Sequence, residues 1–380
     1  MAIEYGLNEE QEMLKTMARD FLEKECPKAL VREMMEDESG HSPELWKKMA
    51  EVGWLGLVIP EEYGGAGMSF RDLTILCEEM GRALLPGPFL STLLLAGDPI
   101  LSAGTDEQKQ EFLPRIAGGE IVLTPAVLEA DGDLWAEGIA VKAARRGDEY
   151  IISGTKLFVP DAKAADYLLV AARTQRSEDP EEGITLFLVD AREWGIYITP
   201  LNTLDETRKQ YEVSFTNVAA PAANIVGELH QGWPILKRAA LLASAALCAE
   251  MVGGGEWVLE TTVNYAKDRI AFGVPIGSFQ AIKHKCANMH TGLEYARSLM
   301  EWAAETIKED SPDAAVAVSM AKSFCGDTYK MVTNEGIQIH GGIGFTWDHD
   351  MHLYFKRARS SDTAFGDSNY HRELIAQAID

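Results

Sequence analysis

The spacing of apolar and polar positions changes twice along the 380-residue chain. In the first third, Asn8 and Gln11 have the form of a capping box, and Leu14, Met17 and Phe21 follow on one helical face. From about residue 121 the apolar runs become short, rich in β-branched and aromatic residues, and separated by Gly, Pro and Asp. This pattern is typical of strands in an antiparallel β domain.

The last third returns to helical spacing. Apolar residues recur there at intervals of four and three, at Ile282, Cys286, Met289, Leu293, Ala296 and Met300. Such a seam predicts packing against other helices. The order is therefore α, β, α, and no GxGxxG follows a strand, which disfavours a nicotinamide-binding doubly wound sheet. We expect a multidomain α+β fold, with a helical domain over residues 1–119, an antiparallel β-barrel-like domain over 120–228 and a four-helix bundle over 229–380.

Composition narrows the classes of function. The formal net charge of −24 argues against nucleic-acid binding, which needs clustered Lys and Arg. No apolar run is long enough to cross a bilayer, and the N-terminus lacks the pattern of a secretory signal, so we expect a cytoplasmic protein, of bacterial type. The five cysteines are scattered without CxxC or CxxH pairs, so neither a metal site nor a disulfide framework is indicated.

The stretch "YAKDRIAFGVPIGSFQAIKHK", residues 265–285, predicts a helix that ends and another that begins near Ser278. A helix N-terminus carries free N–H groups and a partial positive charge, which favour phosphate. Arg269 lies just upstream and can form bidentate bonds to a pyrophosphate, while Phe272 offers a flat face and Gln280 an amide. The alternative is an ordinary helix–helix turn whose arginine makes a surface salt bridge.

A second stretch, "IQIHGGIGFT" at residues 337–346, brings Gly342 and its neighbours after a helix, where a backbone could approach a ligand closely, and Gln338 one turn earlier. Together the two stretches resemble the C-terminal domain of the acyl-CoA dehydrogenase family. The resemblance extends in order over essentially the whole chain, through "GWLGLVIPEEYGGAG", "GTDEQKQEFLPRIAGGE", "ISGTKLFVPDAKAADYLLVAART" and "YEVSFTNVAAPAANIVGELHQGW".

The resemblance implies FAD lying between the β domain of one subunit and the helical bundle of its neighbour. It also implies α,β-dehydrogenation of an acyl-CoA thioester, with electrons passing to an electron-transfer flavoprotein. Matched to the family motifs, Arg269, Phe272, Gln280, Gln338 and Gly342 would bind the ADP half of a FAD seated mainly in an adjacent subunit. A homo- or hetero-oligomer, a dimer or a tetramer, follows from such a shared site.

The sequence departs from the family where the chemistry occurs. The family's catalytic glutamate corresponds to Phe365 in "TAFGDSNYH", and a second placement of that base corresponds to Ala243; neither side chain can accept a proton. In the flavin pocket, Leu128 replaces a threonine, leaving backbone amides to serve the flavin. Phe158 can still cover a ring face, but Pro160 offers neither a hydroxyl nor an N–H group.

Three hypotheses stay open. In the first, the chain completes a FAD site on a different catalytic subunit, as in heteromeric family members, one subunit type of which its "FGD" and "TWDHDMHLYFKRA" segments resemble. In the second, the chain is self-sufficient and Asp367 is a relocated base, although an aspartate there is more often a helix cap. In the third, the fold serves binding alone or flavin chemistry without an α-proton base, such as oxygen activation. A histidine base is chemically possible among His340, His349, His352 and His371.

Overall fold

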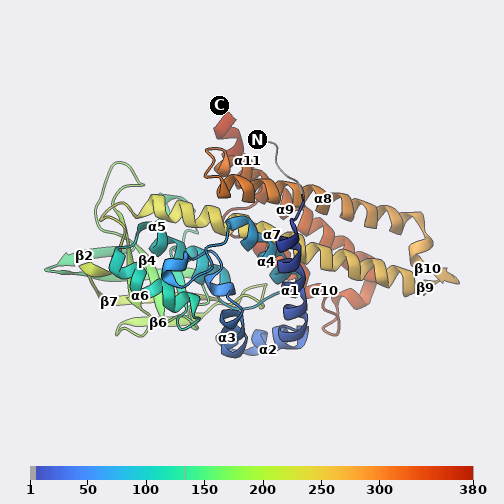
Figure 1. Ribbon diagram of the computed structural model, residues 1–380, viewed down its shortest axis with the longest axis horizontal. Helices are drawn as coiled ribbons and strands as arrows, with labels where there is room; N and C mark the ends of the chain where they lie inside the picture. Colours follow the sequence, from blue (N-terminus) through green and yellow to red (C-terminus); the bar gives the residue numbers. More distant parts are fainter. Residues whose placement is uncertain (1–5, 133, 380) are drawn as a thin grey trace. The chain divides into compact units, whose positions relative to one another are not determined.

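The computed structural model describes residues 6–132 and 134–379 (Figure 1). The chain divides into two compact units, each assembled from separate segments. The first unit takes the chain up to Val31, then Ser69–Leu85 and the chain from Ser244 onward; the second takes Arg32–Met68 and Pro86–Ala243. The domain boundaries at residues 119/120 and 228/229 stay a prediction from the sequence.

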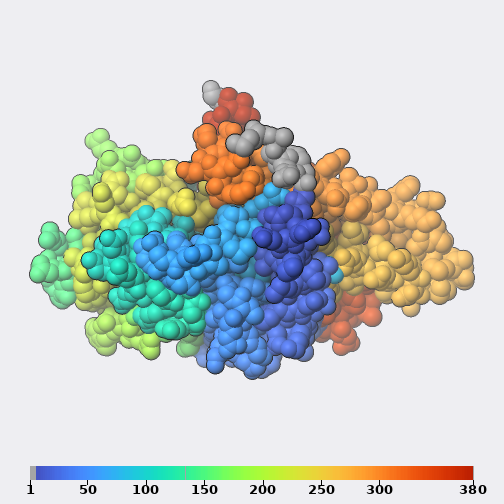
Figure 2. Space-filling model, in the orientation of Figure 1, coloured from blue at the N-terminus to red at the C-terminus, as the bar shows by residue number. Residues whose placement is uncertain are grey.

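Helices make up most of the first unit. Its described helices are α1 (Glu9–Glu25), the start of α2 (Lys28–Glu36), α4 (Phe70–Ala83), most of α7 (Gly232–Asp268), α8 (Gln280–Lys308), α9 (Ala314–His340), α10 (Met351–Thr363) and α11 (Ser368–Ile379). Figure 1 shows the long helices α8 and α9 side by side, and α1 lies on the face seen in Figure 2, where it is dark blue.

The capping box at the start of α1 is confirmed. Gln11 N donates to Asn8 Oδ1 at 2.9 Å, and Asn8 N donates to Gln11 Oε1 at 3.2 Å, so each side chain satisfies a backbone donor of the other residue. Two glycines bring α4 and α7 into close contact: a Cβ on Gly81 would lie 2.0 Å from Glu250 O, and one on Gly253 would lie 1.8 Å from Glu78 O. Any larger side chain at either position would force these helices apart.

The predicted seam of α8 is confirmed over its C-terminal part. Met289, Leu293, Ala296 and Met300 are buried, whereas Ile282 and Cys286 are only half-buried. The difference arises because the first two turns of α8 belong to an exposed corner of the unit and not to its core.

The second unit contains the β domain. Its sheet has the order β6-β7-β3-β2-β4-β5-β8, with β1 paired to β4. The strands are β1 (Leu123–Ala126), β2 (Lys142–Arg146), β3 (Glu149–Pro160), β4 (Tyr167–Arg173), β5 (Ile184–Asp190), β6 (Ile196–Pro200), β7 (Gln210–Pro221) and β8 (Ile225–Val226). Most neighbours are antiparallel, as expected, but β1 and β2 pair with β4 in parallel.

Short helices accompany this sheet in the second unit. They are α3 (Pro43–Glu51), a single π-helical segment (Ser91–Gly97), α5 (Asp98–Ala103) and α6 (Asp106–Ala117). The sheet core is apolar and continuous, and its largest buried members include Tyr150, Ile152, Phe187, Tyr211 and Phe215. Among residues 6–132 and 134–379 the structure offers no membrane-spanning helix.

Candidate active site

The corner between α7 and α8 is exposed, as a ligand-binding corner must be. A short hairpin of β9 (Ile270–Ala271) and β10 (Val274–Pro275) projects from it, and Phe272 at its tip is 95% exposed. Phe272 has φ +54° and Gly273 φ +80°, so a non-glycine residue occupies the left-handed region at a tight turn. Such a conformation is costly for phenylalanine.

Arg269 and Gln280 flank this hairpin. Both are exposed, and Ile276 N donates to Arg269 O at 2.8 Å, which fixes the arginine backbone at the base of the hairpin. Helix α8 begins at Gln280, close to the predicted Ser278, and among the described residues no side chain caps its first N–H groups. The corner therefore presents a guanidinium and a helix N-terminus to solvent, a pair suited to a diphosphate.

The glycine loop after α9 is open as well. Gly341 has φ +65°, a conformation that glycine adopts most easily, and a Cβ built on Gly341 or Gly342 meets nothing within 4 Å. Gln338 is exposed one turn earlier. A ligand could thus approach the main chain of this loop without meeting a side chain.

A ring stack that the sequence did not predict connects the loop to the corner. His340, buried at the end of α9, stacks on Tyr265 of α7 with ring centroids 4.3 Å apart, and Tyr265 Oη donates to His340 O at 3.4 Å. His340 Nδ1 donates to Gly336 O at 2.8 Å, and burial lowers the pKa of His340. Because Arg269 N bonds to Tyr265 O, the stack holds the arginine and the glycine loop at the same end of the unit.

The position of the family's catalytic glutamate lies in a tightly held turn. Phe365 is half-buried with φ +58°. Lys322, which is fully buried, donates through Nζ to Asp362 O and Gly366 O, each at 2.9 Å, and His371 Nε2 donates to Phe365 O at 3.1 Å. Burial lowers the pKa of Lys322, and burial together with the Lys322 charge lowers the pKa of His371 to about 4. Three hydrogen bonds from buried side chains therefore hold the carbonyls of this turn, and the side chain at position 365 is an apolar ring.

Asp367, the predicted relocated base, occupies the start of α11. Its Oδ1 accepts from Asn369 N at 3.0 Å and from Tyr370 N at 2.8 Å, the contacts of a helix cap, and the side chain is exposed. Its catalytic role stays a prediction. Ala243 of α7 is fully buried and supplies no polar atom.

The flavin-facing residues predicted in the β domain lie on β3 and the segment that precedes β2. Phe158 is 44% exposed with φ +52°, at a bulge between Lys156 and Val159 where β3 loses register with β7. Leu157 N donates to Leu128 O at 2.9 Å. Pro160 has no N–H group, and its carbonyl accepts from Thr124 Oγ1 at 2.5 Å. The main chain at Leu128 and Pro160 is therefore held by hydrogen bonds, although neither residue has a side-chain hydroxyl.

Sequence reasoning missed the ion pair that orders this main chain. Lys156 is fully buried; its Nζ donates to Glu129 Oε1 at 2.7 Å and to Val127 O at 2.8 Å. Glu129 Oε1 also accepts from Ala140 N and Val141 N, each at 2.9 Å. Burial lowers the pKa of Lys156 to about 8, although Glu129 raises it. A lysine in phase with the inward-facing Tyr150 and Ile152 was the available signal, because such a lysine requires a buried partner.

These residues fit half of a FAD better than the whole. The exposed guanidinium, the uncapped start of α8 and the open glycine loop suit its diphosphate. The β domain offers main-chain groups and the Phe158 ring for the isoalloxazine, but no side-chain hydroxyl at positions 128 or 160. Within the described part of the chain, no three His, Cys, Asp or Glu side chains are grouped to hold a metal ion.

Comparison with known sequences identifies the family. The N-terminal, middle and C-terminal domains of the acyl-CoA dehydrogenases match residues 8–120, 129–218 and 230–379. The chain is 33% identical to a 3-(aryl)acrylate reductase of Clostridium sporogenes, over 98% of each chain. It is 34% identical to acyl-CoA dehydrogenase IpdE2 of Mycolicibacterium smegmatis, over 95% of this chain and 96% of the relative. The caffeyl-CoA reductase–Etf complex subunit CarC of Acetobacterium woodii is 29% identical, over 97% and 98%.

Solved structures agree. Butyryl-CoA dehydrogenase from Megasphaera elsdenii superposes with a TM-score of 0.92 at 26% identity, over 99% of this chain and 100% of the other. A chain of the ChsE4–ChsE5 complex from Mycobacterium tuberculosis gives 0.89 at 26% identity, over 99% of both. The chain therefore belongs to the acyl-CoA dehydrogenase family. It is a flavoprotein oxidoreductase that acts on a CH–CH bond of an acyl-CoA thioester, and this family uses FAD.

Proposed function

We propose that this chain is one subunit of a two-component acyl-CoA dehydrogenase. Its Arg269 corner binds the ADP half of a FAD whose isoalloxazine lies in a different subunit, and that subunit also carries the catalytic base. One observation carries the proposal: the corner with Arg269 and Gln280 is exposed, whereas the turn that corresponds to the family's base carries Phe365 and is held by hydrogen bonds to its carbonyls.

The absence of a carboxylate at position 365 supports a catalytic base supplied by another subunit. Removing the α-proton of an acyl-CoA requires a general base within hydrogen-bond reach of that carbon. The side chains of Phe365 and Ala243 have no atom that can accept a proton. Lys322 and His371 donate hydrogen bonds to carbonyls of the Phe365 turn. A partner subunit that carries the glutamate supplies what this chain lacks.

In the assembled enzyme, the residues of this chain bind and orient. The Arg269 guanidinium pairs with a diphosphate oxygen, the free N–H groups at Gln280 favour the same negative charge, and Gly341 and Gly342 allow close approach of the main chain. Phe272 covers an apolar face of the cofactor. When bound, FAD would supply the acceptor for the hydride that leaves the β-carbon of the thioester. The Tyr265–His340 stack sets the spacing of the two binding segments.

The names of two similar proteins support the proposal that this chain works with other subunits. The ChsE4–ChsE5 structure is described as a complex, and the Acetobacterium protein is a subunit of a reductase–Etf complex. We extend both features to this chain: a second dehydrogenase-type subunit as partner, and an electron-transfer flavoprotein as electron acceptor. A cytoplasmic location stays a prediction.

The test compares the chain purified alone with the chain co-expressed with the dehydrogenase-like product of a neighbouring gene. FAD per polypeptide and turnover are measured with saturated acyl-CoA thioesters of several lengths, and with a 3-arylpropionyl thioester because a relative acts on arylacrylates. We expect little FAD and no turnover from the isolated chain, and both from the complex. Full FAD loading and turnover by the isolated chain would overturn the proposal.

The second candidate is a self-sufficient dehydrogenase that uses Asp367. Its support is the exposed carboxylate two residues from the vacant position, with one oxygen, Oδ1, engaged in capping. It predicts turnover by the isolated chain, abolished in Asp367→Asn. Oxygen-using chemistry would instead appear as bound flavin that reoxidises rapidly in air without any thioester reductant.

A further inference from the structure

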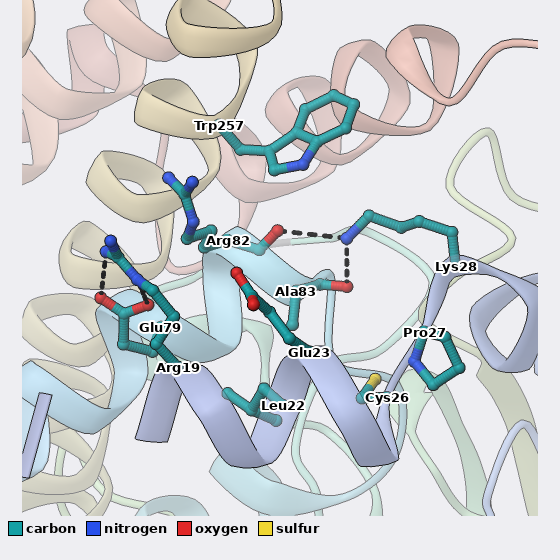
Figure 3. Close-up of a pocket in the computed structure, with 10 residues that line it drawn as sticks. All are labelled: Arg19, Leu22, Glu23, Cys26, Pro27, Lys28, Glu79, Arg82, Ala83 and Trp257. Carbon is teal, nitrogen blue, oxygen red and sulfur yellow. Dashed lines mark hydrogen bonds and ion pairs between the residues drawn. The ribbon is translucent and has the colours of Figure 1, made fainter. Parts of the chain in front are cut away.

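A cavity within the first unit lies apart from the corner, the glycine loop and the Phe365 turn. It has a volume of about 250 Å³, and residues of α1, α4 and α7 line it together with Lys28 at the start of α2 (Figure 3). Its walls include the aromatic face of Trp257 and the apolar side chain of Leu22, with the paired Arg19 and Glu79 at one end. The Lys28 side chain extends along one edge of this space toward α4.

The amine of Lys28 has two firm partners. Its Nζ donates to Ala83 O at 2.7 Å and to Arg82 O at 3.2 Å, the last carbonyls of α4. It also lies 5.2 Å from the ring centroid of Tyr354 and 5.5 Å from that of Trp257, and these two rings stack on each other. The neutral amine keeps two N–H groups, enough for both carbonyls, and has its lone pair left for reaction.

The two carbonyls and the two rings favour the charged amine, but burial favours the neutral form and outweighs them. Burial lowers the pKa of Lys28 to about 8, and the charges of Arg357 and Arg82 act in the same direction, while Cys26 and Asp350 oppose them. At pH 8 about half of such amines are neutral, against about 0.4% for a lysine of ordinary pKa near 10.4. The population of nucleophile is therefore about 100-fold larger than at an ordinary surface lysine.

We propose that Lys28 is an acyl-acceptor site, modified by the acyl-CoA thioesters on which the family acts. The lone pair of Nζ attacks the thioester carbonyl, a C–N bond forms and the C–S bond breaks. Coenzyme A leaves as its thiolate and takes up the proton that the nitrogen releases. No electrons are transferred, and the thioester is the one co-reactant.

Acylation changes the contacts at this junction. The amide nitrogen carries no charge and one N–H group, so one of the two carbonyl bonds and both cation–π contacts are lost. The acyl chain enters the cavity against Trp257 and Leu22. Helix α4 loses part of the cationic cap at its C-terminus, so the modified chain unfolds at a lower temperature than the unmodified chain.

The chain provides matched controls. Lys24 lies four residues earlier with 80% of its side chain exposed. Lys322 is buried and also donates to two carbonyls, but it does not line the cavity. Comparing the three lysines separates access alone and burial alone from the combination found at Lys28.

The experiment incubates the intact chain with butyryl-CoA at pH 8, with butyrate plus free coenzyme A as the blank, and follows acyl occupancy of each lysine by peptide mass spectrometry. Lys28 should acylate about tenfold faster than Lys24, since its larger neutral fraction outweighs its weaker basicity, while Lys322 stays unmodified. In Lys28→Arg the fast phase should vanish and the Lys24 rate should not change. Equal rates at Lys28 and Lys24, or no label on Lys28, would overturn the proposal. Neither result bears on the two-subunit proposal, because the cavity lies in this chain alone.

Discussion

The rings of Tyr265 and His340 stack with centroids 4.3 Å apart and 23° between their planes. This contact joins the last turns of α7 to the end of α9. Arg269 begins the corner four residues after Tyr265, and Gly341 follows His340 directly. The stack thus fixes the separation between the cation and the open main chain that together would grip a diphosphate.

Replacing Tyr265 by Leu removes the stack that positions the two segments. We expect this to cost about 1.4 kcal/mol of FAD binding free energy to the assembled enzyme, which is a tenfold increase in Kd. The measurement is FAD titration of the complex followed by flavin fluorescence. Trp257→Leu is the matched control, because it removes another ring stack of α7, the one with Tyr354 at 4.1 Å, which does not include His340. Equal losses of FAD affinity in both variants would mean that the Tyr265 effect is a nonspecific destabilisation of the first unit.

Asp367→Asn should leave turnover of the complex within about twofold of wild type, because asparagine caps a helix about as well as aspartate. Asp367→Ala should lower the free energy of unfolding by about 1 kcal/mol through loss of the cap. Steady-state kinetics and urea denaturation separate the two effects. Abolished turnover in Asp367→Asn, with stability unchanged, would establish the relocated base instead.

Removing one charged partner of the Lys156–Glu129 ion pair should destabilise the folded chain. Lys156→Met leaves a carboxylate without its buried partner and should lower the free energy of unfolding by about 3–5 kcal/mol. The double variant Lys156→Met/Glu129→Gln should recover a large part of that loss, because no unpaired charge remains. Urea unfolding of the two single variants and the double variant gives the coupling energy. Additive losses would show that the two side chains act independently.

His371 should make stability pH-dependent. Its pKa is lowered from 6.5 to about 4 in the folded chain, so between these values the unfolded chain binds more protons than the folded one. Stability is therefore lost as pH falls from 6.5 to 4, by about 3 kcal/mol for this group, and the loss is complete below pH 4. Its physical cause is burial beside the Lys322 charge.

The check is the difference in unfolding free energy between pH 7 and pH 4.5. His371→Gln keeps a donor for Phe365 O but cannot gain a charge. The difference in unfolding free energy should therefore become smaller, by most of the amount that His371 contributes. His290→Gln is the control, since 65% of the His290 side chain is exposed. An unchanged pH dependence in His371→Gln would contradict the assignment.

Local signals in the sequence predicted local features well. The capping box at Asn8, the buried part of the α8 seam and the helix start near Ser278 depend on residues a few positions apart, and the structure contains all three. The predicted corner is exposed, and its binding role stays a prediction.

Features that depend on distant contacts were not predictable. Lys156 meets Glu129 across 27 positions, and Tyr265 meets His340 across 75. The phase of Lys156 indicates that this lysine is buried, but nothing in the sequence identifies Glu129 as its partner. His340 by itself resembles any other histidine on a helix. The strained backbone at Phe158 and Phe365 was also hidden, because φ is set by the bulge and the clamped turn and not by the side chain's own preference.

The central claim is that Arg269 of this chain holds a FAD that serves a different subunit. The direct measurement is FAD per complex and turnover of the assembled enzyme carrying Arg269→Ala in this chain alone, with assembly checked by size-exclusion chromatography. We predict an intact complex that loses FAD and turnover in the same proportion, both restored at high added FAD. A complex that keeps its full FAD content and activity without this guanidinium would contradict the account.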